Sequence, residues 1–259
     1  MIGNDPLDIA SVHTVCSFVL VRASIETRVS CWQGISEVAN TITILSKRVR
    51  SLAAMAEVKT KDIETLAYVV HGAGEPFKLE QVTLDELAAD ELLVDIEYSG
   101  ICATDLGFQA GKIKLCPYPA IFGHEGAGKI LAIGNKVQNK DWKVGDRVLL
   151  SMNYCQKCKF CKSEHPADCV EGTRLHLFGL RDNGTTAAKL NGNDVRFHFF
   201  GQSSFAKRSF VHETCVVKVP EGVKDEDIPS LAAMGCGYQT GIFRHCCNAK
   251  GSDELIFHL

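Results

Sequence analysis

The sequence lacks three features that would each point to a particular class of protein: a long apolar run, a surplus of charge of one sign, and internal repeats. No uncharged apolar stretch approaches the ~20 residues that a helix needs to cross a bilayer. The longest apolar run near the start, Val15 to Val21, contains Ser17 and follows Asp5 and Asp8, which makes it a poor signal peptide. The 28 Lys and Arg against 31 Asp and Glu give a net charge of −3, without the positive excess of a dedicated nucleic-acid binder. We therefore expect neither a membrane nor a nucleic acid as a partner.

The composition is that of a folded chain. Of its 259 residues, 46% are apolar and 23% are charged, which is ample for a packed core and excludes disorder throughout. The length suits one large or two modest domains. Residues 1–54 differ in character from the rest of the chain, and we interpret them as a leader or an over-extended N-terminus that is poorly ordered, with Met55 as a workable start. An organellar presequence is the alternative, which Asp5 and Asp8 disfavour.

Twelve cysteines are many for one chain, and four of them have the spacing C-x2-C-x2-C-x7-C. The four are Cys155, Cys158, Cys161 and Cys169. An even number of cysteines also allows an extracellular disulfide framework, but neighbours this close are more naturally thiolates around one ion than partners in separate bridges. Four thiolates complete the tetrahedron of a zinc ion, so we expect a structural zinc in the loop 155–169 and a reducing, cytoplasmic location.

From residue 64 onward the apolar pattern takes a period of two, which indicates strands. The clearest case covers residues 92–98 and ends at Gly100. Further short strands, separated by glycine-rich turns, are expected at Ile121–Gly123, Ala127–Ile133, Asp146–Ser151, Val195–Phe200, Ser209–His212 and Cys215–Pro220. A helix is expected to begin within 224–241, where acidic residues precede Pro229 near the first helical position. Many short strands favour an all-β barrel or sandwich.

Three separated segments carry a second set of candidate residues: Gly100–Asp105 after a strand, Gly123–Gly126 between two short strands, and Gly235–Gly241 after the helix start. Each segment alone is a weak signal. A cysteine such as Cys102 is more often a small buried hydrophobic residue, and a lone histidine such as His124 is usually structural. Cys236 could simply let a helix pack closely.

Taken together and in that order, the three segments resemble the zinc-dependent alcohol dehydrogenases of the medium-chain dehydrogenase/reductase family. The resemblance runs from about residue 60 to residue 241 and includes a four-cysteine loop between the second and third segments. Within the family, Phe200–Ala206 and Met234–Gly241 look most like the aryl- or benzyl-alcohol dehydrogenase branch. The implied fold is mainly β with some α: a GroES-like, partly open β-barrel catalytic domain over residues 55–241.

The resemblance also implies roles for single residues. Cys102, His124 and Cys236 would bind a catalytic zinc, which makes two zinc ions per chain with the structural one. Two thiolates and a neutral imidazole leave zinc a fourth position that is open to an oxygen, where it acts as a Lewis acid. As further catalytic residues, Asp105 would orient His124, Glu125 would lie beside the metal as an occasional alternative ligand, and Thr104 would take the alcohol's proton into a relay.

The chain departs from the family pattern in two places near Cys102. Members often carry a basic residue directly after this cysteine, where it meets the cofactor pyrophosphate, and here Ala103 stands there. Many also carry a relay histidine five residues after it, where this chain has Gly107. We therefore assign no cofactor-binding residue.

The family's Rossmann cofactor domain is expected to be absent from this chain. Its fingerprint is a strand followed by G-x-G-x-x-G at the start of a helix. Gly72–Gly74 comes after an apolar stretch, but Pro76 and Phe77 stand where a third glycine and a helix are required, and Gly235–Gly237 has the wrong spacing. After Gly241 the sequence leaves the family pattern, and we interpret 242–259 as the divergent tail of a truncated or mis-spliced gene product, with a genuine short form as the alternative.

The function expected from these observations is that of a zinc-binding oxidoreductase domain of the alcohol dehydrogenase type. It would oxidise a primary alcohol, with an aromatic one as the finer expectation, to an aldehyde by hydride transfer from a zinc-bound alkoxide to NAD(P). Because the cofactor domain is missing, we expect the chain to be inactive alone and to use NAD(P) only if that domain is supplied. The alternatives are a non-enzymatic zinc module acting in protein–protein interaction, and a domain that pairs with a further chain, including a homo-oligomer.

Overall fold

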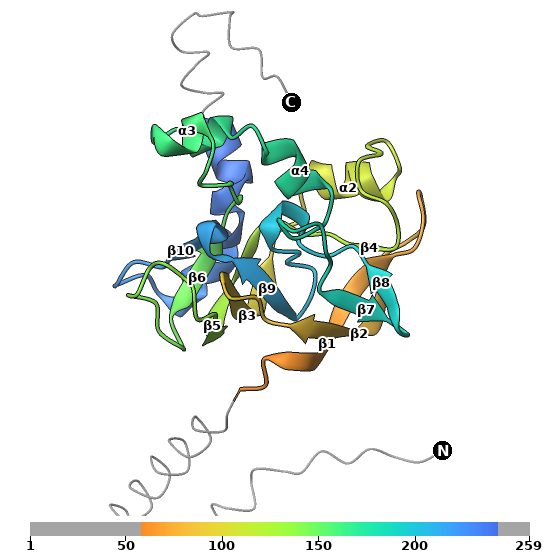
Figure 1. Ribbon diagram of the computed structural model, residues 1–259, viewed down its shortest axis with the longest axis horizontal. Coiled ribbons are helices and arrows are strands. Elements are labelled where there is room, and N and C mark those ends of the chain that lie inside the picture. Colours follow the sequence, from red (N-terminus) through yellow and green to blue (C-terminus); the bar gives the residue numbers. More distant parts are fainter. Residues whose placement is uncertain (1–57, 243–259) are drawn as a thin grey trace, which may run out of the picture. The chain divides into compact units, whose positions relative to one another are not determined.

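The structure, a computed structural model, describes residues 58–242 (Figure 1). The expected leader (1–54) lies outside the described residues. The expected divergent tail (242–259) also lies outside them, except for residue 242. In the described part, no helix combines the length and apolar character required to cross a membrane.

Short strands dominate the described chain. In chain order they are β1 (Lys61–Val70), β2 (Lys78–Glu86), β3 (Glu91–Ser99), β4 (Ala120–Ile121), β5 (Gly126–Ile133), β6 (Arg147–Leu150), β7 (Ala188–Leu190), β8 (Asn193–Val195), β9 (Arg208–His212) and β10 (Val216–Lys218). The α-helices are α2 (Ala103–Gln109), α3 (Lys159–Lys162), α4 (Gly172–Leu177) and α5 (Ile228–Leu231). The 3-10 turns are η2 (Pro166–Asp168), η3 (Phe199–Gly201), η4 (Glu213–Cys215), η5 (Asp225–Asp227) and η6 (Ala232–Gly235).

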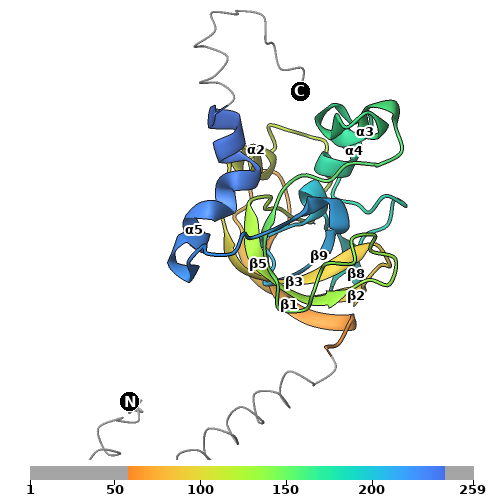
Figure 2. The ribbon, with the colours of Figure 1, turned by 90° about the vertical axis from the view of Figure 1, so that its left-hand side faces the viewer.

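The strands form two five-stranded sheets with the orders β4-β1-β2-β7-β8 and β10-β6-β5-β3-β9, and every pair of neighbours is antiparallel. Figure 2 shows the sheets curling around a common interior, as in a partly open barrel. In β1 the side chains alternate between buried and exposed along most of the strand, because one face lies on the core and the other faces solvent. The mainly β fold with a few helices that the sequence predicts is confirmed.

The largest core cluster fills the space between the two sheets. Ile63 and Val69 of β1 and Leu84 of β2 contribute from the first sheet, and Leu93 of β3 and Phe210 of β9 from the second. A separate aromatic cluster closes one end of the barrel, where the rings of Phe108 of α2 and Phe122 both lie edge-on to Phe199 of η3. This cluster matters for function because residues 123–126 and η3 lie directly beside it.

Two of the expected elements are wrong in detail. The expected strand Val195–Phe200 ends at Val195, and the 3-10 turn η3 begins at Phe199. Phe200 inside this turn has a φ of 53°, and His198 directly before it has a φ of 83°. An alternating apolar pattern cannot reveal such left-handed backbone, since it is imposed by the packing of the aromatic cluster. The expected helix within 224–241 is broken into η5, α5 and η6, with Cys236 in a non-helical conformation before residues 237–242 become helical.

Candidate metal centres

Three segments that are far apart in the sequence bring their side chains together at one end of the barrel. Cys102 lies immediately before α2, His124 in the turn between β4 and β5, and Cys236 directly after η6. One ligand atom from each of these residues, together with a carboxylate oxygen of Glu125, lies within 4.8 Å of all the others. We call Cys102, His124 and Cys236 the Cys-His-Cys cluster.

One buried carboxylate holds the first two ligand segments together. Asp105, in the first turn of α2, accepts a hydrogen bond from the backbone N–H of Cys102 at 2.9 Å and another from that of Gly123 at 2.9 Å. Oδ1 of Asp105, the oxygen that accepts from Gly123, also lies 3.1 Å from His124 Nδ1. Asp105 is fully buried, so the contact fixes the imidazole in a low-dielectric environment and leaves its other nitrogen, Nε2, to face the sulfurs.

Glycines permit two close approaches at the site, one of which brings the third ligand segment onto β6. A Cβ on Gly235 would lie 2.1 Å from the carbonyl oxygen of Leu150, so η6 can sit on β6 only without a side chain there. A Cβ on Gly100 would likewise lie 2.1 Å from Glu125 Oε2. The other oxygen of Glu125 accepts a hydrogen bond from the Gly237 N–H at 3.2 Å, which connects the buried carboxylate to the segment that carries Cys236.

The charges of the cluster are strongly coupled. The sulfurs of Cys102 and Cys236 lie 3.9 Å apart. Burial opposes ionisation of Cys102, but hydrogen bonds from Thr104 and the nearby His124 hold its pKa below the ordinary value. The pKa of Cys236 is raised although His124 favours its thiolate, since burial and the neighbouring Cys102 oppose a second negative charge. Burial disfavours a charged His124, yet Asp105 and Cys236 raise its pKa to about 10.

The donor set fits a zinc ion. His124 is 1% exposed, and its Nε2 has no hydrogen-bond partner among residues 58–242, which is a costly state for a buried polar atom. A cation between this nitrogen and the two sulfurs would satisfy the imidazole and allow both cysteines to be thiolates. Sulfur and imidazole nitrogen are the ligands that zinc prefers.

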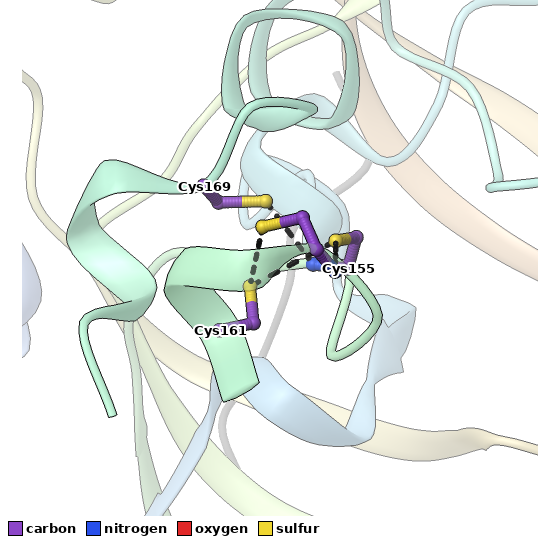
Figure 3. Close-up of side chains that lie close together, drawn as sticks. Cys155, Cys161 and Cys169 are labelled. Carbon is purple, nitrogen blue, oxygen red and sulfur yellow. Dashed lines mark hydrogen bonds between the residues drawn. The ribbon is translucent and has the colours of Figure 1, made fainter. Parts of the chain in front are cut away.

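The four-cysteine loop forms the second cluster. The ligand atoms of Cys155, Cys158, Cys161 and Cys169 all lie within 4.8 Å of one another. Figure 3 shows the labelled side chains of Cys155, Cys161 and Cys169 directing their sulfurs toward one another from α3 and the adjoining turns. Cys155 Sγ accepts hydrogen bonds from the N–H groups of residues 157 and 158 at 3.4 and 3.3 Å.

The four thiols of the loop differ in their pKa values. Backbone N–H groups of residues 161 and 170 lower the pKa of Cys158 to about 6. Desolvation and the neighbouring thiols raise the pKa of Cys161 to about 12. Four thiolates this close repel one another, so a divalent cation is the group that would let all of them ionise. The arrangement therefore fits the zinc that the spacing predicts.

The remaining predicted residue, Thr104, lies in the first turn of α2 and is half-buried. Its Oγ1 is 3.7 Å from Cys102 Sγ, so its hydroxyl borders the cluster. The family resemblance indicated that Thr104 lies near this site, but the sequence did not identify a side chain that its hydroxyl contacts.

Sequence reasoning missed two residues that build the site from η3 and the residue after it. Gln202 is fully buried; its amide donates to the carbonyl oxygens of His124 at 3.0 Å and Ser151 at 2.7 Å, and its Oε1 accepts from the Gly126 N–H at 3.2 Å. The ring of Phe200 stacks on the imidazole of His124 with 4.4 Å between centroids and 21° between planes. Both residues lie in a segment that the sequence marked only by its resemblance to one branch of a family.

Known proteins resemble this chain over the same region. A family model for the alcohol dehydrogenase GroES-like domain matches residues 88–221. A geraniol dehydrogenase from Castellaniella defragrans is 37% identical over 180 residues, which cover 69% of this chain and 46% of that protein. The chain therefore spans about half the length of the curated relatives that it matches.

Solved structures agree in both fold and sequence. An alcohol dehydrogenase zinc-binding domain protein from Burkholderia ambifaria is 36% identical with a TM-score of 0.64, covering 69% of this chain and 47% of that one. A benzyl alcohol dehydrogenase from Acinetobacter calcoaceticus is 38% identical with a TM-score of 0.62, covering 69% and 46% respectively.

Proposed function

This chain belongs to the family of the alcohol dehydrogenase GroES-like domain, and on that premise we propose that it holds two zinc ions and binds a small-molecule alcohol for oxidation at the Cys-His-Cys cluster. The observation that carries the proposal is the buried Nε2 of His124, which faces two sulfurs and has no hydrogen-bond partner within the described residues 58–242. The loop of four cysteines would hold a second zinc with a structural role.

The chain's own residues supply the surroundings of the reaction. A zinc ion held by Cys102, His124 and Cys236 would supply Lewis acidity at the oxygen of a bound alcohol. Asp105 keeps His124 Nδ1 occupied and so directs Nε2 at the metal position. Thr104 presents a hydroxyl that can accept and pass on a proton, and Glu125 holds a buried carboxylate next to the ligands.

The proposed reaction converts a primary alcohol to an aldehyde, with NAD(P) as the hydride acceptor. An aromatic alcohol is the proposed substrate class, because a solved benzyl alcohol dehydrogenase is 38% identical over 69% of this chain.

The test is cobalt substitution of the full chain and then addition of benzyl alcohol. Co²⁺ reports its ligands through its visible spectrum, and we expect two spectral components, one of which changes when benzyl alcohol is added. Cys236→Ala should remove that component and its response, while the component from the four-cysteine loop stays. A wild-type chain that binds one metal ion only, at the loop, contradicts the proposal and favours the non-enzymatic zinc module.

The expectation that the chain is inactive on its own stays a prediction. It is checked by NAD(P)-linked oxidation of benzyl alcohol with purified chain. Turnover of ~1 per second or more, the range of ordinary dehydrogenases, would contradict it while supporting the assigned reaction.

A further inference from the structure

Three aromatic rings form a continuous stack that begins at the Cys-His-Cys cluster. The imidazole of His124 lies on the ring of Phe200 at 4.4 Å and 21°. The other stacking partner of Phe200 is the imidazole of His176 in α4, at 5.1 Å and 9°. Phe200 is therefore stacked against two histidines, one of which belongs to the proposed metal site.

The stack supplies a restraint that the hydrogen bonds of His124 do not. Asp105 contacts Nδ1 at one edge of the imidazole, and a contact at an edge leaves the ring free to tilt about that edge. The ring of Phe200 covers a face of the imidazole, and Phe199 meets it at 74° between planes. Because Nε2 must point at the space between two sulfurs, the tilt of the ring decides whether it meets the metal.

Phe200 is held in place by the two segments that flank the four-cysteine loop. His176 Nε2 donates to the backbone carbonyl of Asn153 at 2.6 Å, which ties the segment after the loop to the segment before it. A Cβ on Gly201 would lie 2.7 Å from Asn153 Cγ, so η3 presses closely on the same segment. The helix α4 begins three residues after Cys169 and packs against η3 (Figure 1).

Phe200 adopts its position at a conformational cost. Its φ of 53° lies in the left-handed region that non-glycine residues rarely occupy, and the nearby His198 also has a positive φ. Backbone of this kind persists only where the surrounding packing demands it, and it is concentrated at functional sites. Here it turns a ring toward a proposed metal ligand.

We propose that Phe200 is a positioning residue for the metal centre, which clamps the imidazole of His124 in the orientation that binds the ion and is itself anchored on the four-cysteine loop through His176. The proposal rests on the proposed function, because it requires a metal at His124. It adds that the two cysteine clusters are mechanically connected through side chains that bind no metal.

The experiment is a Co²⁺ titration of the full 259-residue chain with zinc retained in the four-cysteine loop. The spectrum of Cys236→Ala, which keeps only the loop, is subtracted from each titration. For Phe200→Leu we expect the dissociation constant of Co²⁺ at the Cys-His-Cys cluster to rise about tenfold or more, the range seen when a side chain that supports a ligand is removed. The ligand-field bands should shift, since the nitrogen donor changes its angle.

Two variants separate positioning from general loss of stability. Phe200→Tyr keeps the ring and should restore both affinity and band positions to within about twofold of the wild type, well inside the effect expected for Leu. Phe210→Leu removes an equally large ring from the core between the sheets, where it lies under the Arg181 guanidinium, and should lower the melting temperature without moving the cobalt bands. Should Phe200→Leu fail to fold, His176→Ala removes the outer ring of the stack and should shift the same bands in the same direction.

The outcomes distinguish this inference from the function on which it rests. Wild-type affinity and bands in Phe200→Leu, or an equal change in Phe210→Leu, overturn the positioning role and leave the metal site intact. Unchanged bands in His176→Ala overturn the anchoring on the loop. A wild-type chain with no cobalt signal from Cys102, His124 and Cys236 overturns the proposed function, and the positioning role with it.

Discussion

The two cysteine clusters of this chain use the same chemistry but are assembled in opposite ways. The four-cysteine loop draws all its ligands from residues 155–169, a single surface segment. The Cys-His-Cys cluster draws its ligands from residues 102, 124 and 236, which are brought together by two sheets, a helix terminus and a broken helix. One cluster is therefore local in the sequence, and the other exists only when the whole fold does.

The difference teaches how each cluster gains its stability. A short loop restricts few residues when it closes around an ion, so metal binding itself can order it. The Cys-His-Cys cluster is instead prepared by the fold, with Asp105 and Gln202 fully buried and hydrogen-bonded to the ligand segments. We therefore expect metal binding at the Cys-His-Cys cluster to be sensitive to substitution of the residues that hold its ligand segments, such as Asp105 and Gln202, and metal binding at the loop to be insensitive to the same substitutions.

The largest effect is expected from removing one ligand of each cluster. Cys236→Ala should reduce the zinc content from about two to about one per chain, because two remaining ligands do not hold the ion tightly. Cys161→Ala should also reduce it, but with a loss of thermal stability, since the loop then loses the ion that orders it. Elemental analysis and calorimetry measure the two effects.

Cys215→Ala provides the matched control for both. This cysteine is buried under η3 and belongs to neither cluster, so the zinc content should stay at the wild-type value. An unchanged zinc content in Cys236→Ala would break the comparison, because the ion would then depend on other ligands.

The second largest effect is expected from destabilising the β-sheets. The Cys-His-Cys cluster depends on the sheets for its assembly, whereas the four-cysteine loop does not. Glu91 of β3 is 2% exposed and pairs with Arg181 at 2.7 Å and His198 at 2.8 Å. Glu91→Gln leaves buried charge without its partner and should cost about 3 kcal/mol at neutral pH. In urea, the cobalt signal of the Cys-His-Cys cluster should then disappear at a lower concentration, while the signal of the four-cysteine loop moves less.

The same pair gives a pH dependence with a defined sign. Burial opposes ionisation of Glu91, but His198 and Arg181 outweigh it and lower its pKa from 4.5 to about 2. The stabilisation is therefore complete above about pH 4.5 and is lost as the pH falls toward about 2. The stability difference between wild type and Glu91→Gln should shrink between pH 7 and pH 3. Glu97→Gln, which faces Lys129 on the exposed side of β3, should show neither effect.

How far the sequence predicts each cluster depends on whether its ligands are neighbours in the chain or are brought together by the fold. The four-cysteine loop is predictable from spacing alone, because its ligands are neighbours in the chain. The existence of strand β3 is also predictable from the alternation over 92–98. Its burial does not follow that alternation, because Leu92, Leu93 and Val94 are all buried and Tyr98 is exposed. The members of the Cys-His-Cys cluster are individually weak signals, and only their order beside the loop, through a family resemblance, indicated them together. That they bind zinc stays a prediction.

What the sequence could not reveal depends on tertiary packing. Helix α2 begins after Cys102, which is not a usual capping residue, and its sequence includes Gly107, a poor helix former. The turn at η3 reads as a strand because Phe and His alternate there, whereas the aromatic cluster forces positive φ values. The stack of Phe200 between two histidines results from that turn, so no local pattern could have announced it.

The third effect concerns Asp105, whose carboxylate holds two ligand segments of the Cys-His-Cys cluster in place. Asp105→Asn replaces one of the two acceptor oxygens by an amide N–H₂. The N–H groups of Cys102 and Gly123 bond to different oxygens of Asp105, so the amide can keep only one of these two hydrogen bonds. Metal affinity at the Cys-His-Cys cluster should fall about 10- to 100-fold, and affinity at the four-cysteine loop should not change. Competition with a chelator measures both. Asp95→Asn, whose carboxylate pairs with Lys207 on the surface, is the control, and a drop of equal size there would contradict the orienting role.

The smallest effect is expected from a lysine inside the four-cysteine loop. Three lysines alternate with its ligands, and their charge could offset that of four thiolates, but Lys157 is 79% exposed and already pairs with Asp182 at 3.1 Å. Exposed pairs are screened by water and contribute ~0.2–1 kcal/mol, so Lys157→Gln should change the metal affinity of the loop by less than about fivefold. Lys189→Gln, which disturbs an exposed pair with Asp85 away from the loop, sets the background for the chelator competition. A tenfold loss in Lys157→Gln alone would show that the loop is held by its surface charge as well as by its sulfurs, and the local cluster would then be less self-sufficient than its spacing predicts.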